Sequence, residues 1–148
     1  MIIDQNFIKK VKKVCMPIAR EIRLTFRKYE NEYKFDGLWG IDIKKDILKQ
    51  IDKNISEGIV ISTFGVIHHT DSTLSKKDVL IPLCRNADKY FMRYEGHKGE
   101  DVQEKLKYLQ PVLFNPREFH SVAPNGFPTK LPLIVATLTF PDTIKISA

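Results

Sequence analysis

The stretch that decides the fold is "GIVISTFGVIHHTDSTLS", residues 58–75. Its first ten residues are rich in β-branched and aromatic side chains, which is typical of a buried β-strand. The last eight residues crowd two histidines, one acid and four hydroxyl side chains together. A second stretch, "VLFNPREFHSVAP" at residues 112–124, places His120 in a similar setting. The sequence therefore raises the question of whether the two stretches meet around a shared ligand such as a metal.

Length and composition indicate one globular domain that spans residues 1–148. Apolar residues make up 43% of the chain and charged residues 28%, which is typical of a folded protein. No apolar run approaches the roughly 20 residues of a membrane span, and the N-terminus lacks the apolar core of a secretory signal. Cys15 and Cys84 have no metal-type spacing and are expected to be reduced thiols. These features predict a cytoplasmic protein with no membrane segment.

The formal net charge of +6 allows an acidic partner such as nucleic acid but does not require one. The densest basic group contains four lysines that alternate with apolar residues at helical spacing: Lys9, Lys10, Lys12 and Lys13. The solvated face of an amphipathic helix accounts for this pattern without any partner.

The N-terminal part, residues 1–57, is expected to support the rest of the fold. Residues 4–15 are predicted to form a short helix that Pro17 ends, followed by a half-buried strand at residues 18–26. A second helix is predicted between a capping Asp42 and a terminating Gly58. Its apolar stripe is Ile47, Leu48, Ile51 and Ile55.

From residue 58 onward the pattern is that of strands. About six short apolar segments follow one another at intervals of about ten residues, separated by turn-forming residues. This half of the chain lacks the crossover helices that a parallel sheet needs. The sequence therefore predicts a mainly β protein, an antiparallel sandwich or barrel at residues 58–140 with the helices packed outside.

A metal site is the chemistry that the histidine stretches favour. Residues i and i+2 of an extended segment point to the same side, so His69 and Asp71 are expected to converge. His120, on another short apolar strand, is the candidate for a third ligand. Two histidines and one carboxylate on one side of a metal leave the opposite positions open, as in non-haem Fe(II) oxygenases.

The ordered set of His69-x-Asp71, "VLIPL", "PVLFN", "FHSV" and a following basic residue resembles the 2-oxoglutarate- and Fe(II)-dependent dioxygenases. The resemblance covers residues 58–140 and implies a double-stranded β-helix, also called a jelly roll. It also implies that His69, Asp71 and His120 hold Fe(II). Lys130, ten residues beyond His120, would then anchor the far carboxylate of 2-oxoglutarate, as in the prolyl 4-hydroxylase branch of the family.

The same resemblance implies an activity. An enzyme of this family uses O₂ to convert 2-oxoglutarate to succinate and CO₂ and oxidises a primary substrate, which the sequence does not identify. An acid at position 71 favours hydroxylation over halogenation by analogy with the family. The expected protein is therefore a hydroxylase with Fe(II) as cofactor and 2-oxoglutarate as cosubstrate.

Two other classes of function remain open. A cupin-like metal protein would keep the three metal ligands without using 2-oxoglutarate, and it would tolerate the loss of Lys130. A basic, non-enzymatic nucleic-acid-binding module would show strongly salt-dependent binding and no metal requirement. Outside the expected site, His68 should point away from His69, and His97, in a polar loop, is expected to be exposed to solvent.

Overall fold

The computed structural model describes residues 1–29, 39–71, 73–126 and 130–148. It contains two α-helices, α1 (Gln5–Tyr29) and α2 (Lys45–Ile51), and one 3₁₀ helix, η1 (Arg85–Lys89), within these ranges. The strands in the same ranges are β1 (Trp39–Asp42), β2 (Glu57–Thr63), β3 (Val66–His69), β4 (Lys77–Pro82), β5 (Tyr90–Glu95), β6 (Asp101–Lys105), β7 (Val112–Phe114), β8 (His120–Pro124) and β9 (Leu133–Phe140).

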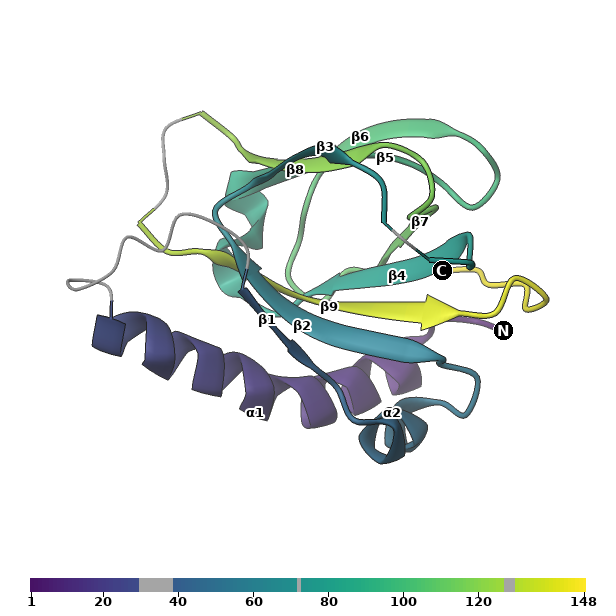
Figure 1. The fold of residues 1–148 in the computed structure, drawn as a ribbon, viewed down its shortest axis with the longest axis horizontal. Coiled ribbons are helices and arrows are strands. Elements are labelled where there is room, and N and C mark those ends of the chain that lie inside the picture. Colours follow the sequence, from purple (N-terminus) through teal and green to yellow (C-terminus); the bar gives the residue numbers. More distant parts are fainter. Residues whose placement is uncertain (30–38, 72, 127–129) are drawn as a thin grey trace.

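The strands form two antiparallel sheets that face each other (Figure 1). One sheet has the order β1-β2-β9-β4-β7 and the other has the order β3-β8-β5-β6. The last eight strands pair as nested hairpins: β2 with β9, β3 with β8, β4 with β7 and β5 with β6. This nesting, shared between two sheets, is the topology of a jelly roll, so the predicted fold is confirmed.

Helix α1 extends from Gln5 to Tyr29, so the prediction that it ends before Pro17 and is followed by a strand at residues 18–26 is wrong. Pro17 lies inside the helix. The apolar positions Cys15, Ala19 and Ile22 continue the helical spacing past the proline, and all three are fully buried against the sheet. Burial of this stripe offsets the hydrogen bond that proline cannot donate.

The second helix exists but is shorter than predicted. It begins after Lys44 and ends before Asp52, so Asp42 is not its cap and belongs to β1. Gly58 lies within β2, where a Cβ atom would come within 2.6 Å of the Leu48 side chain of α2. The glycine is thus needed for close packing of the helix on the strand and does not terminate the helix.

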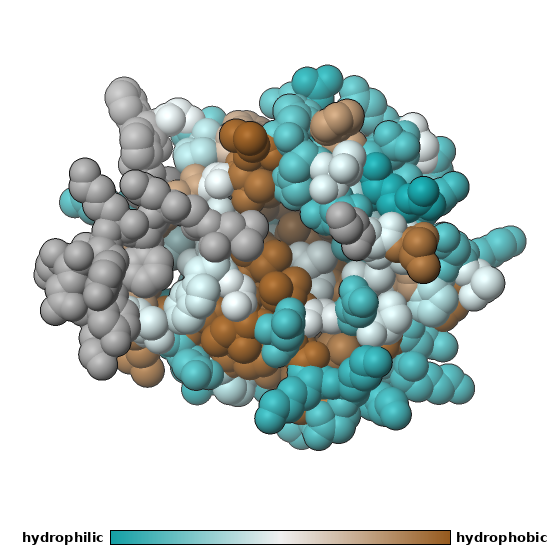
Figure 2. Space-filling view, in the orientation of Figure 1, coloured by the Kyte–Doolittle hydropathy of each residue, from teal (hydrophilic) through white to brown (hydrophobic). Residues whose placement is uncertain are grey.

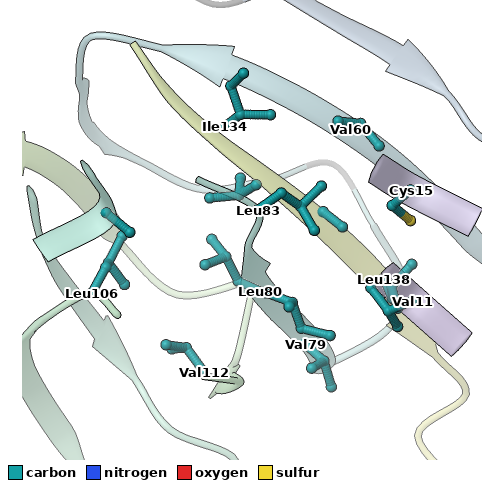
Figure 3. Close-up of a cluster of buried hydrophobic side chains, with 14 of the residues drawn as sticks. Val11, Cys15, Val60, Val79, Leu80, Leu83, Leu106, Val112, Ile134 and Leu138 are labelled. Carbon is teal, nitrogen blue, oxygen red and sulfur yellow. The ribbon is translucent and has the colours of Figure 1, made fainter. Parts of the chain in front are cut away.

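One layer of the core lies between α1 and the outer face of the five-stranded sheet, and the same cluster of buried side chains continues into the space between the two sheets (Figures 1 and 3). In Figure 3, Val11 and Cys15 of the helix point toward the strands that carry Leu138 and Val60. Phe7 and Phe140 extend this layer, with ring centroids 6.3 Å apart. The helix thus covers one face of the sheet and leaves the other face directed toward the interior of the roll.

The stretch 58–69 forms two strands, β2 and β3, which belong to different sheets. The break is at Gly65, whose φ of +147° is rarely adopted by other residues. The Thr63 hydroxyl donates to the Gly65 carbonyl and accepts from its N–H, both at 3.0 Å. The turn lets the apolar strand and the histidine strand face each other across the interior.

No helix in the described part of the chain is long and apolar enough to cross a membrane. The division into a support region at residues 1–57 and a core at residues 58–140 remains a prediction.

Candidate metal centre

The two histidine stretches meet, because β3 and β8 are neighbours in the four-stranded sheet. His69 is the last residue of β3, His120 is the first residue of β8, and the two are directly paired in the antiparallel register. Asp71 follows β3 by two residues, and its backbone N–H donates to the Pro116 carbonyl at 2.8 Å. Strand pairing and one loop contact therefore bring the three predicted ligands together.

The three side chains converge on a single point. Asp71 Oδ1 lies 3.2 Å from His69 Nε2, and Asp71 Oδ2 lies 3.2 Å from His120 Nε2. One ligand atom from each residue can be chosen so that all three lie within 4.8 Å of one another. Within the described residues this is the one group of three or more histidine, cysteine or acidic side chains close enough to hold a metal.

Hydrogen bonds on the far side of each ring set the tautomer of both histidines. His69 Nδ1 lies 2.8 Å from the Ile67 carbonyl, and His120 Nδ1 lies 2.9 Å from the Glu118 carbonyl. A carbonyl oxygen only accepts, so each Nδ1 carries the hydrogen and a neutral ring directs its Nε2 lone pair at Asp71. Two lone pairs and a carboxylate repel one another unless a cation, either a proton or a metal ion, lies among them.

The electrostatics of the cluster agree with this requirement. Burial lowers the pKa of His120, but hydrogen bonds to Asp71 and the Glu118 carbonyl, together with the Asp71 charge, outweigh burial and raise that pKa. Burial raises the pKa of Asp71, but hydrogen bonds and charges from His120 and His69 outweigh it and lower that pKa. The cluster therefore stabilises a positive charge among the three side chains, which a proton or a divalent ion can supply.

The cluster borders a cavity of about 600 Å³ in the interior of the roll. The wall is built from alternate residues of the facing strands, because successive side chains of a strand point to opposite faces. Figure 2 shows hydrophobic surface in the middle of the molecule between the two sheets, bordered by hydrophilic side chains. The apolar wall residues in the interior are Ile59, Ile61, Val66, Leu80, Met92, Phe114, Val122, Leu133 and Val135.

Asp78 is a residue of this cavity that sequence reasoning missed. It lies on the inward face of β4 and is 4% exposed, and no described residue forms a hydrogen bond with its Oδ1. Burial is the largest cause that raises its pKa from 3.8 to about 7; the Asp71 charge adds to the increase, while a hydrogen bond to Thr139 and the His120 charge oppose it. The only signal in the sequence was an acid directly before the apolar run "VLIPL".

Lys130 is exposed and is not among the residues that line the cavity. It precedes β9, which begins at Leu133, whereas Thr139 near the other end of that strand pairs with Asp78. Asp78 also pairs with Phe114, whose ring centroid lies 5.1 Å from that of His120. The three candidate ligands therefore lie near the Thr139 end of β9, whereas Lys130 lies before the opposite end of that strand.

The two remaining histidines lie outside the cluster. His68 is exposed, as expected for a side chain on the opposite face from His69, and its Nε2 is 3.5 Å from Ser121 Oγ. The expectation that His97 is exposed to solvent is wrong, because it is half-buried, with Nε2 2.9 Å from the backbone carbonyl of Asp78. His97 thus contacts the backbone of β4 at Asp78 and helps to hold this strand segment in place.

No protein-family model matches the chain, and no curated protein matches it in sequence. Among solved structures, a cupin domain of an XRE-family transcriptional regulator from Enterobacter cloacae is 13% identical, with a TM-score of 0.47 over 71% of this chain and 97% of that chain. A cupin domain from Bordetella pertussis Tohama I is 14% identical, with a TM-score of 0.45 over 73% of this chain and 97% of that one. HppE in its Co(II) form is 9% identical, with a TM-score of 0.47 over 72% of this chain and 55% of that one.

Proposed function

We propose that this protein is a mononuclear non-haem Fe(II) oxygenase whose metal is held by His69, Asp71 and His120. The observation that carries the proposal is the convergence of two oriented Nε2 atoms and one carboxylate at the edge of an internal cavity. Nitrogen and oxygen donors in this two-histidine, one-carboxylate set are typical of Fe(II) sites that keep open positions for substrate and O₂. Bound Fe(II) would supply the activation of O₂.

The residues of the chain have separate tasks in this proposal. The carbonyls of Ile67 and Glu118 hold the two rings with Nε2 toward the metal, which is how partners behind the ligands orient a metal site. Phe114 packs against His120 and shields that side of the centre from water. The apolar walls of the roll favour an organic substrate and limit side reactions with solvent.

Dependence on 2-oxoglutarate is a narrower form of the same proposal. It would require a cation near the metal to anchor the far carboxylate, and Lys130 was the predicted anchor. Because Lys130 is exposed and lies beyond the opposite end of β9, the placement favours a centre that acts without 2-oxoglutarate. Binding of Fe(II) and binding of 2-oxoglutarate are therefore measured separately.

Anaerobic titration calorimetry tests the metal centre. Fe(II), or Mn(II) as a redox-inert substitute, should bind the wild-type protein in a 1:1 ratio, and His69→Ala and His120→Ala should each abolish binding. His68→Ala is the matched control, because this exposed histidine adjoins His69 and should leave metal affinity unchanged. Equal metal binding by wild type and His120→Ala would refute the proposal.

The cosubstrate is tested in the same cell by adding 2-oxoglutarate to the metal-loaded protein. Because Lys130 does not line the cavity, we expect that 2-oxoglutarate either does not bind or binds equally well to wild type and to Lys130→Ala. Metal-dependent binding that is lost in Lys130→Ala would instead establish the 2-oxoglutarate-dependent dioxygenase with the anchor that the sequence predicted. O₂ consumption by the Fe(II)-loaded protein with and without 2-oxoglutarate gives the matching activity readout.

A further inference from the structure

The cavity at the metal centre is acidic, although the whole chain carries a formal net charge of +6. Among the described residues that line it are four carboxylates and one ammonium, a formal charge of −3, which becomes −1 with a divalent ion bound. These residues are Asp42, Lys45, Glu57, Asp71 and Asp78. Low-dielectric walls strengthen the field of such a group, so the cavity attracts cations and repels anions.

The acids are ordered by the strand register. Thr139 of β9 pairs with Glu57 on one side and with Asp78 on the other, and Asp78 pairs in turn with Phe114. Side chains of directly paired residues point to the same face, and neighbouring strands lie about 4.8 Å apart. Glu57, Thr139 and Asp78 therefore form a row of polar side chains that runs from the exposed acid to the buried one. Phe114 is the next residue in this row, and its ring packs against His120 of the metal centre.

Asp78 is the member of this row that has a buried oxygen without a partner among the described residues, although its carboxyl also has a hydrogen bond to Thr139. Asp78 lines the cavity with only 4% of its surface exposed, and its Oδ1 accepts no hydrogen bond from the part of the chain that the structure describes. Leaving a buried acceptor unsatisfied costs roughly 1–3 kcal/mol. A ligand with a donor group at this position would remove that cost, and a charged donor would also be attracted by Glu57.

We propose that the metal cavity binds an organic cation, a primary ammonium on an apolar chain, and that Asp78 receives the ammonium group. The apolar chain lies against the aliphatic walls of the two sheets, and the ammonium lies at the acidic row near the metal. The chemistry performed on this ligand rests on the proposed iron centre, but its recognition depends only on the cavity. Asp78 is thus a specificity-determining residue for the substrate.

The test compares three probes of equal chain length that differ only in the head group: hexylamine, hexan-1-ol and hexanoate. Calorimetry on the Mn(II)-loaded protein should show hexylamine binding most tightly and hexanoate most weakly. Asp78→Asn, which keeps the shape of the side chain and removes the charge, should weaken hexylamine binding about tenfold or more, as expected for a hydrogen bond between charged groups. Hexanol binding should change little.

Two further variants make the result specific. Glu57→Gln removes an exposed acid of the same row and should weaken hexylamine binding by a smaller factor without any effect on folding. Asp101→Asn makes the same charge change on β6, where the side chain is exposed and outside the cavity, and it should have no effect. Hexanoate binding as tightly as hexylamine, or unchanged hexylamine affinity in Asp78→Asn and Glu57→Gln, would overturn the inference.

The same titrations separate this inference from the proposed function. Metal binding without a preference for the amine would leave the iron centre intact and remove the assignment of the substrate class. An amine preference in a protein that binds no metal would keep the specificity of the cavity and remove the iron centre.

Discussion

Along strand β9 the side chains alternate between two environments. Ile134, Ala136 and Leu138 are almost completely buried under α1, whereas Thr137 and Thr139 face the cavity and remain half-buried. At this end of the strand the same backbone contributes to stability on one face and presents hydroxyl groups on the other, whereas Leu133 and Val135 keep the cavity wall apolar at the opposite end. The comparison shows that the outer face is packed along its whole length, while the inner face becomes polar toward Asp78, whose Oδ1 has no partner among the described residues.

The largest expected effect is on the outer face. Leu138→Ala should lower the free energy of unfolding by about 2–5 kcal/mol, because it removes a fully buried side chain from the layer beneath α1. Thr137→Ala, the adjacent residue on the cavity face, should cost about 1 kcal/mol or less. Urea denaturation followed by circular dichroism measures both values. Similar losses for the two variants would mean that the faces do not differ in the way described.

The inner face should instead gain stability when its buried acid is neutralised. In the metal-free protein Asp78 has a pKa of about 7, against an ordinary value of 3.8, so the folded state holds a proton that the unfolded state releases. Stability from this group is complete below pH 3.8 and is lost as pH rises toward 7. Asp78→Asn should therefore be more stable than wild type by on the order of 2–4 kcal/mol at pH 8.

The same comparison at pH 4 should show a much smaller difference between the two proteins, because Asp78 is then protonated in the folded state and only partly ionised in the unfolded state. Denaturation curves at a series of pH values give the dependence directly. A constant difference across this range would show that the carboxyl of Asp78 does not titrate as its burial requires.

Metal binding should stabilise the inner end of the roll. At a metal concentration 100 times the dissociation constant, the gain is about 2.7 kcal/mol, or a rise of about 5–10 °C in Tm. The gain should be smaller at pH 5 than at pH 7.5, because protons compete for the Nε2 atoms and the pKa of His120 is raised. Thermal denaturation with and without Mn(II) measures it, and His69→Ala should show no increase where His68→Ala does.

The smallest effect is expected at the far end of β9. Lys130→Ala should change the free energy of unfolding by less than about 0.5 kcal/mol, since the side chain is exposed. The same variant should leave Mn(II) affinity unchanged, because Lys130 does not line the metal cavity. A loss of metal affinity in this variant would place the lysine closer to the centre than the strand register does.

The convergence of the three candidate ligands could be predicted because its signals are local. Spacing by two residues put His69 and Asp71 on one side of an extended segment, and only His120 stood in a comparable setting elsewhere in the chain. The continuation of helix α1 past Pro17 could not be predicted from the neighbouring residues, because it depends on the burial of Cys15, Ala19 and Ile22 against the sheet. The penalty of one missing hydrogen bond is smaller than the gain from that buried stripe.

The sequence by itself determined the antiparallel β architecture and the three residues that converge. Alternating apolar side chains and turn residues follow directly from the geometry of a strand, and this geometry is local. Only the tertiary structure decided that Asp78 faces the cluster, that Lys130 lies at the opposite end of its strand, and that the cavity is acidic. These properties depend on which strands become neighbours and in what register, and residues far apart in the chain meet only when the sheets close.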